Sequence, residues 1–187
     1  MDLKIAGKKA LICGGSAGLG FVCAEALARE GVNVVIAART KETLGLAAIK
    51  LKAIAIASVS HVAADVTTDV GRASIFSQHP SFDIVITNAG GPPPGDFRDW
   101  DRDAWLRALD ANMLSPIAII QQVVDGMMQR GFGRIINITS SAVKSPVDGL
   151  GLSIGARSGL TGFVAGLARS TVARGVRSEE RRVGKEC

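Results

Sequence analysis

KALICGGSAGLGFVCAEALA, residues 9–28, joins a short apolar run to a glycine-rich turn and a helical pattern. The run over residues 9–13 is typical of a buried strand, and the residues after Gly20 have the apolar spacing of a helix. Gly14, Gly18 and Gly20 allow a tight turn that approaches a pyrophosphate, and the following helix offers this anion its free N–H groups. The stretch predicts a phosphate-binding loop, although glycine-rich turns also serve plain helix–strand packing.

Short β-branched runs alternate with helical stretches along the rest of the chain. Strands are predicted at residues 9–13, 33–37, 60–63, 83–87 and 134–139, and helices at about 19–30, 41–56, 70–78, 102–130 and 152–173. Strand–helix–strand connections of this length predict right-handed crossovers, so the fold class is α/β with a doubly wound parallel sheet. Ligands of such sheets bind at the carboxyl ends of the strands, where the motifs below fall.

The composition favours one soluble domain. Of the 187 residues 47% are hydrophobic, and the net charge of +5 comes from scattered Lys and Arg, which argues against nucleic-acid binding. Cys13, Cys23 and Cys187 are too few for a disulfide framework or a metal site such as zinc. No apolar run approaches the roughly 18 residues of a membrane span, and no signal peptide is evident. We expect a cytoplasmic protein without membrane contact.

The last residues of the chain differ from the rest. Residues 177–187 leave the apolar periodicity for the charged string RSEERRVGKEC. This string resembles the in-frame translation of a common sequencing adapter, so we divide the chain into a domain over residues 1–176 and a tail over residues 177–187. A charged, disordered tail is the alternative interpretation.

The end of the second predicted strand bears on cofactor choice. Residues 34–40, VVIAART, contain no acid, whereas a site that prefers NAD needs one there to bind the ribose 2′-hydroxyl. Arg39 instead lies 19 residues past Gly20 and can pair with a 2′-phosphate through charge-assisted hydrogen bonds. The sequence therefore predicts NADP(H), unless Arg39 is only a solvated surface residue.

The glycine spacing and two later motifs resemble the short-chain dehydrogenase/reductase family, in particular its 3-oxoacyl-carrier-protein reductases. Ala64-Asp65-Val66 is similar to the family segment whose aspartate binds the adenine amine, and Thr87-Asn88-Ala89-Gly90 to its Asn-Asn-Ala-Gly signature. The resemblance covers residues 6–176, with Cys13 in place of the usual threonine. It implies an NAD(P)-binding Rossmann fold in which the cofactor-binding residues are Gly14, Ser16, Gly18, Leu19, Gly20, Arg39, Asp65, Val66, Asn88, Ala89, Gly90 and Arg157.

The resemblance also assigns four catalytic positions. Asn112 and Ser140 match the asparagine and serine of the family's catalytic tetrad. The Tyr-x-x-x-Lys pair should follow on the next helix, and the register of residues 156–160, ARSGL, places Ser153 at the tyrosine and Arg157 at the lysine. The chain contains no tyrosine at all. Because a serine hydroxyl is a far weaker acid than a phenol, proton transfer is expected to be impaired while cofactor binding persists.

These assignments imply an NADP(H)-dependent oxidoreductase that moves a hydride between the nicotinamide and a small carbonyl or alcohol substrate, with 3-oxoacyl compounds as candidates. Ser140 would orient the substrate, Asn112 would distort its helix or hold a water, and Arg157 would clamp the cofactor. The missing tyrosine and lysine leave open a catalytically silent relative that binds NADP(H) as a sensor or partner subunit. A purely structural α/β domain is a third possibility.

Family members are longer than this chain, so the resemblance implies that the last strands of the sheet are absent. It also implies that the intact protein is a homo-oligomer, paired through the helices predicted at 102–130 and 152–173. The second of these helices contains the small residues Gly155, Gly159, Gly162 and Gly166. They permit close packing between subunits, or equally against the rest of the same chain.

Overall fold

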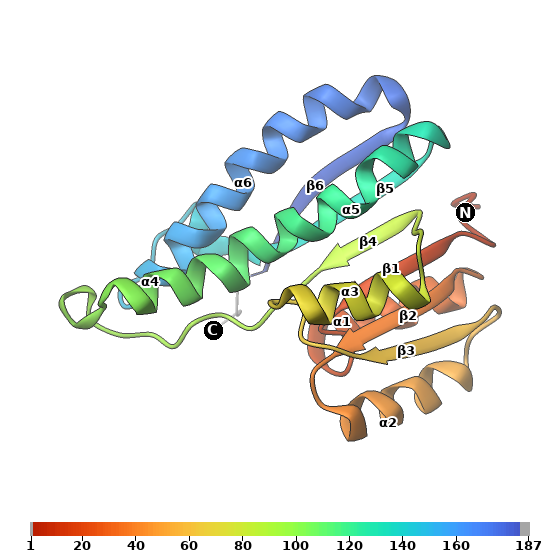
Figure 1. Cartoon of the computed structure of the whole chain (residues 1–187), viewed down its shortest axis with the longest axis horizontal. Coiled ribbons are helices and arrows are strands. Elements are labelled where there is room, and N and C mark those ends of the chain that lie inside the picture. The colour runs from red at the N-terminus through yellow and green to blue at the C-terminus, as the bar shows by residue number, and fades with distance from the viewer. Residues whose placement is uncertain (1, 184–187) are drawn as a thin grey trace.

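The computed structural model describes residues 2–183 as alternating strands and helices (Figure 1). In chain order they are β1 Lys9–Cys13, α1 Gly18–Arg29, β2 Asn33–Ala38, α2 Lys41–Lys52, β3 Val59–Ala63, α3 Asp69–Gln78, β4 Ile84–Thr87, the 3-10 turn η1 Phe97–Asp99, α4 Arg102–Leu109, the π-turn η2 Asp110–Leu114, α5 Ser115–Gln129, β5 Gly133–Ser140, the 3-10 turn η3 Ser141–Val143, α6 Gly151–Thr171, the 3-10 turn η4 Val172–Arg174 and β6 Val176–Val183.

The strands form one parallel sheet in the order β3-β2-β1-β4-β5-β6. The chain winds outward from β1 in one direction through β2 and β3, and then in the other through β4, β5 and β6. β1 is central and pairs with both β2 and β4, which places the reversal of winding between β1 and β4. This arrangement confirms the predicted doubly wound α/β fold, and it marks the β1–β4 crevice as the expected ligand position.

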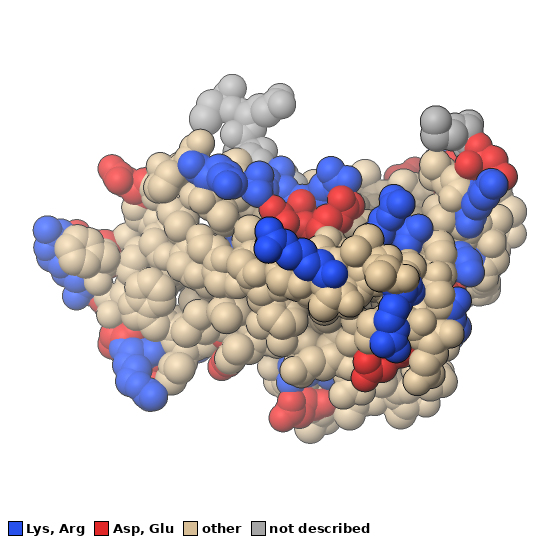
Figure 2. All heavy atoms as spheres, turned by 90° about the horizontal axis from the view of Figure 1, so that it is seen from above, with Lys and Arg blue, Asp and Glu red and all other residues tan. Residues whose placement is uncertain are grey.

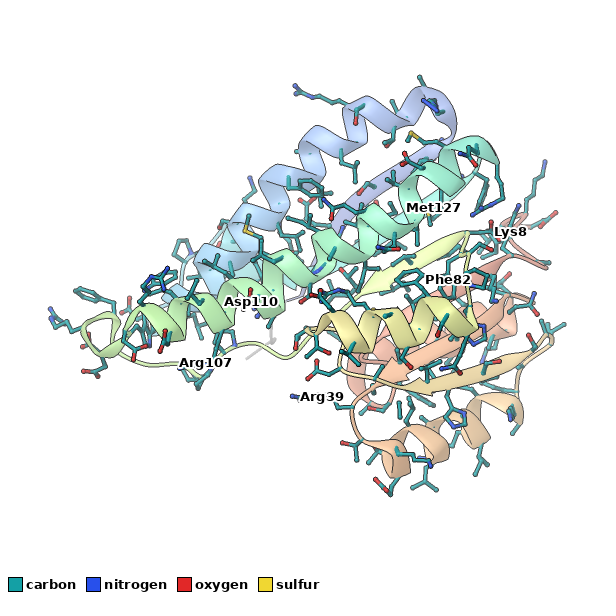
Figure 3. The ribbon with its side chains drawn as sticks, in the orientation of Figure 1. Lys8, Arg39, Phe82, Arg107, Asp110 and Met127 are labelled. Atoms are coloured by element: carbon teal, nitrogen blue, oxygen red, sulfur yellow. The ribbon has the colours of Figure 1, made fainter. Side chains whose placement is uncertain are left out.

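Helices cover the two faces of the sheet in separate layers. Buried side chains of α1 and α2 pack on one face with those of β1, β2 and β3. On the other face, α3 and α5 contribute Ile75, Ile119 and Met127 to a core that includes Phe82 and Val85, and α6 packs against this core. Figure 3 shows Phe82 and Met127 pointing into this layer. The strands therefore bury both faces, which explains their nearly continuous apolar sequences.

The helices depart from the sequence prediction in two places. The helix predicted over residues 41–56 ends at Lys52. The helix predicted over 102–130 is broken into α4, the π-turn η2 and α5. A periodicity of apolar residues did not reveal this break, because the chain stays helical through the π-turn and one extra residue shifts the apolar pattern only once.

The sixth strand corrects the expectation that the chain lacks every strand beyond the fifth. β6 pairs in parallel with β5 along its whole length, and two β5 side chains add bonds to its backbone. The Asn137 amide donates to the Glu179 carbonyl at 3.2 Å, and the Thr139 hydroxyl donates to the Arg181 carbonyl at 3.4 Å. Residues 177–183 of the predicted tail thus belong to the sheet, residues 184–187 lie outside the described part, and the origin of the string stays a prediction.

The surface carries charges of both signs. On the face drawn in Figure 2, Lys and Arg side chains are interspersed with Asp and Glu. Within residues 2–183, no helix is both long enough and apolar enough to cross a membrane.

Candidate functional site

A cavity of about 340 Å³ opens where β1, β2, β3 and β4 end. Figure 3 shows Arg39 at this end of the sheet and Lys8 at the opposite end. The cavity is lined by Gly14, Ser16, Ala37, Ala38, Arg39, Thr40, Ala64, Asp65, Val66, Thr67, Asn88, Ala89, Gly90, Gly91 and Ala111. Segments far apart in the sequence thus meet at one site, and the glycine loop, Arg39, Asp65-Val66 and Asn88-Ala89-Gly90 do so as predicted.

The glycine loop is closed so tightly that side chains are excluded at Gly14 and Gly20. Gly14 and Gly18 have φ of +64° and +55°, a left-handed conformation that favours glycine. A Cβ on Gly20 would lie 2.3 Å from the Gly14 carbonyl oxygen, and a Cβ on Gly14 would lie 2.8 Å from the Asn88 amide nitrogen. Gly18, Leu19 and Gly20 do not line the cavity. They build the turn and the beginning of α1.

The beginning of α1 is suited to an anion. Its N-cap residue, Ala17, provides no side-chain hydrogen bond, and the first turn contains no acidic residue. The first N–H groups of a helix have no partner within the helix, and the helix dipole places partial positive charge there. Together with a loop that admits no Cβ at Gly14 or Gly20, this end of α1 fits the pyrophosphate of a dinucleotide.

Cys13 stands at the beginning of this loop and is 1% exposed. Burial raises the pKa of its thiol to about 12, and a hydrogen bond with the Asn88 backbone offsets this rise only in part. The thiol therefore stays protonated at neutral pH, so Cys13 serves as a small packing residue and offers no nucleophile.

Arg39 and Asp65 give the cavity one cationic and one anionic side chain. Arg39 is exposed at the end of β2, beside Thr40, whose side chain leaves the beginning of α2 without a capping bond. The Asp65 carboxylate accepts hydrogen bonds from the Thr67 hydroxyl at 2.7 Å and the Thr67 backbone N–H at 2.9 Å. These bonds lower the pKa of Asp65, and the charge of Arg39 lowers it slightly further. Asp65 is thus a fixed, ionised acceptor.

The four predicted catalytic residues do not line this cavity. Asn112 sits in the π-turn η2, 4% exposed, and its amide donates to the Ala108 carbonyl at 3.3 Å. Ser140 ends β5, where its hydroxyl accepts a hydrogen bond from the Ala142 N–H at 3.2 Å. Ser153 and Arg157 lie one turn apart on α6, and the Arg157 guanidinium donates to the Ser153 hydroxyl.

Arg157 connects the catalytic candidates to the dinucleotide cavity. It lines a small hollow together with Asn88, Ala89, Ala111 and Asn112. A Cβ on Gly91 would lie 3.4 Å from an Arg157 guanidinium nitrogen, so the side chain packs against the loop after β4. Burial lowers the pKa of Arg157, but an arginine remains a cation at neutral pH. Ser140 forms no hydrogen bond with Asn112, Ser153 or Arg157 within the described chain.

Several residues of the cavity were not predicted from the sequence. Ala38, Thr40, Ala64 and Thr67 directly flank predicted residues, and Ala37 lies two positions before Arg39, so proximity in the sequence was a usable signal. Gly91 and Ala111 also adjoin predicted residues, Gly90 and Asn112, but their place in the cavity depends on contacts between segments that are distant in sequence. Ala111 reaches the cavity only because η2 passes over the end of β4, and Gly91 is confined by a side chain from α6.

Comparisons with known proteins agree with this geometry. A family model described as short chain dehydrogenase matches residues 8–180. An uncharacterised oxidoreductase of Bacillus subtilis, YvaG, is 32% identical over 147 residues, covering 78% of this chain and 56% of the relative. Acetoacetyl-CoA reductase of Cupriavidus necator is 32% identical over 175 residues, covering 89% of this chain and 70% of the relative. The chain is thus shorter than these curated relatives.

Among solved structures, L-sorbose reductase from Gluconobacter frateurii in complex with NADPH and L-sorbose superposes with a TM-score of 0.91. It is 29% identical to this chain, and the match covers 97% of this chain and 71% of that one. The close agreement in backbone extends over the sheet and both helical layers.

Proposed function

The chain belongs to the short-chain dehydrogenase/reductase family, and from this premise we propose that it is an NADP(H)-dependent oxidoreductase acting on a small carbonyl or alcohol, with 3-oxoacyl compounds as candidate substrates. The observation that carries the proposal is the cavity at the strand ends, which combines the glycine loop with Arg39 and lacks an acid at the end of β2. An acid there is what a site for the unphosphorylated ribose requires.

The residues of the chain fit this cofactor. The glycine loop and the beginning of α1 would hold the pyrophosphate, and Asp65 and Val66 would lie at the adenine. The 2′-phosphate would bind to Arg39 and to Thr40, whose side chain makes no capping bond to α2. Asn88, Ala89 and Gly90 would line the adenosine ribose, and Arg157 would hold the nicotinamide ribose. When bound, the nicotinamide supplies the hydride to a carbonyl carbon or accepts it from an alcohol.

Side chains of α6 and β5 would bind the substrate oxygen and stabilise the negative charge that develops on it. The Ser153 hydroxyl accepts a hydrogen bond from Arg157, so its own proton remains available for donation toward the substrate. Ser140 and Ser153 would orient the carbonyl, and the Arg157 cation would stabilise negative charge on its oxygen. A serine hydroxyl and an arginine are both poor proton donors at neutral pH, so the proton would come from bulk solvent and reach the substrate oxygen through a water held at the site.

The second candidate function is a catalytically silent relative that binds NADP(H) as a sensor or partner subunit. The pair formed by Ser153 and Arg157 favours it, because neither side chain can replace the acid–base role of a tyrosine beside a lysine. Binding without turnover separates this function from the first one.

The test is a titration with NADPH and with NADH, in which the fluorescence of the cofactor reports binding. We expect the chain to prefer NADPH and Arg39→Asp to weaken NADPH binding about tenfold or more, because a charge-assisted bond is replaced by repulsion. Lys50→Asp reverses the same charge at an exposed position on α2 away from the cavity, and it should leave NADPH affinity unchanged. Equal affinity for the two cofactors, or a loss shared by both variants, contradicts the assignment of Arg39.

Turnover is then measured as NADPH oxidation with L-sorbose and with an acetoacetyl thioester. Oxidation that stops in Ser140→Ala and Ser153→Ala supports the oxidoreductase. Tight NADPH binding with no oxidation by either compound supports the silent relative.

A further inference from the structure

The helix that carries Asn112 leaves its α-helical path for one turn, and a serine holds this turn. At the end of η2 the Ser115 backbone N–H donates to the Asp110 carbonyl, which lies five residues earlier instead of four. The Ser115 hydroxyl donates to the same carbonyl oxygen at 2.6 Å. Figure 3 shows Asp110 at the junction of α4 and α5. One carbonyl oxygen thus accepts two hydrogen bonds from a single residue.

This hydroxyl favours the π-turn over an ordinary helix turn. Ser115 is 3% exposed, so its hydroxyl needs a partner inside the protein. A serine within a helix ordinarily bonds to the carbonyl three or four residues earlier. In an α-helix the hydroxyl would turn to the carbonyl of Ala111 or Asn112, so its bond to Asp110 exists only with the wider turn.

The next residue acts against the α-helical alternative. Pro116 is buried near the beginning of α5, a place where its missing N–H is tolerated. In a continuous α-helix, residue 116 would donate to the carbonyl of Asn112, which proline cannot do. Ser115 therefore stabilises the π-turn, and Pro116 removes a hydrogen bond from the alternative to it.

The turn determines where Asn112 points. Asn112 faces the hollow that Arg157 and Asn88 also line. Each residue of an α-helix is rotated from the one before it by about 100°, so losing the extra residue of the π-turn would rotate α4 and α5 against each other at Asn112. We propose that Ser115 and Pro116 are positioning residues of the site, which together hold the π-turn that directs Asn112 toward Arg157. The inference rests on the proposed function as far as Asn112 supports the reaction.

Pro116→Ala and Ser115→Ala test the proposal in the 187-residue chain. Pro116→Ala restores the N–H donor, so we expect a thermal midpoint equal to or above that of the unchanged protein. We expect kcat with the acetoacetyl thioester or L-sorbose to fall on the order of tenfold to a hundredfold, because small displacements of a site residue have effects of this size. NADPH affinity should stay the same. A role in stability alone would lower the midpoint together with kcat, and this result, or an unchanged kcat, overturns the proposal.

Amide hydrogen exchange of residues 108–116 gives a readout that does not depend on turnover. It should slow in Pro116→Ala, where the α-helical ladder is completed, and quicken in Ser115→Ala. Ser170→Ala removes a similar bond, from an exposed hydroxyl to the Leu167 carbonyl at 2.9 Å, and should leave residues 108–116 unchanged. If the unchanged protein reduces neither compound, the oxidoreductase function fails. The exchange result still decides the role of Ser115 and Pro116, since unchanged exchange in both variants overturns it.

Discussion

Gly20 shows how closely backbone packing and ligand binding are connected in this protein. The space that a Cβ would occupy is already filled by the Gly14 carbonyl and lies 3.2 Å from the Asn88 amide nitrogen. A side chain here must push the glycine loop away from β4, and the same loop forms one wall of the cavity. The residue is therefore fixed by contact with Gly14 and Asn88, and it is not itself exposed to the ligand.

Gly20→Ala should lower the free energy of unfolding by about 1–3 kcal/mol, the usual cost of overpacking a rigid site, and should weaken NADPH binding. Gly45→Ala is the matched control, because Gly45 lies within α2 with no atom near its Cβ position. It should raise stability by about 0.5–1 kcal/mol, since alanine is the better helix former. Urea denaturation and NADPH titration measure both effects. A Gly20→Ala protein with unchanged stability and affinity would show that the loop is not held as described.

Helix α6 uses one face for packing and another for the catalytic candidates. Gly151, Gly155 and Gly159, spaced by one turn, pack against Trp100, Trp105 and Met113 respectively. Ser153 and Arg157 lie on a different face, toward the catalytic candidates. Gly155 and Gly159 therefore serve contacts within the chain, whereas Gly162 and Gly166 have open space at their Cβ positions. The sequence allowed these glycines to pack either within the chain or between subunits. Gly155 and Gly159 have the first role, and Gly162 and Gly166 remain open for the second.

Gly155→Ala and Gly162→Ala test this division. A Cβ added at Gly155 would lie 2.8 Å from the Trp105 ring, so this ring must shift from its packing on α6 and the thermal midpoint should fall. Gly162→Ala meets no atom and should raise the midpoint. Thermal unfolding monitored by circular dichroism compares the two. Equal shifts of the same sign would mean that α4 does not pack on α6 through Gly155.

The long helices expose apolar and small residues at the surface of the molecule. Leu106 on α4 and Leu114 in η2 are 39% and 48% exposed, and Gly162 and Gly166 of α6 face outward. Figure 1 shows α5 and α6 running side by side. Exposed apolar side chains beside small residues suit close helix packing between subunits. We therefore keep the homo-oligomer, joined through α5 and α6, as a proposal for the intact protein.

Leu114→Glu should shift the oligomer toward monomer, because burying an unpaired carboxylate at an interface is costly. Leu46→Glu introduces the same charge on α2, where the side chain is 61% exposed, and should leave the assembly unchanged. Sedimentation velocity over a range of protein concentrations distinguishes these outcomes. A monomeric parent protein, or dissociation by both variants alike, would contradict an interface at α5 and α6.

Much of the fold and of the cofactor cavity follows from patterns that are local in sequence. The strand runs, the glycine loop and the strand-end residues Arg39, Asp65 and Asn88 each depend on a few consecutive residues and on the rule that parallel strands end at one edge. Ser153 and Arg157 were likewise predictable as a pair, because residues four apart meet on a helix.

Other features depend on groups that are distant in sequence. The approach of Gly91 to Arg157 requires α6 to pack beside the loop after β4. The charged string beyond residue 176 becomes β6 because β5 offers it backbone partners, including the Asn137 amide, and its own sequence has no strand pattern. The π-turn at Asn112 contains a local hydrogen bond from the Ser115 hydroxyl to the Asp110 carbonyl. Ser115 makes this bond inside the protein because tertiary packing buries its hydroxyl. Periodicity and motifs record what each segment prefers alone, whereas these contacts exist only after the segments have packed together.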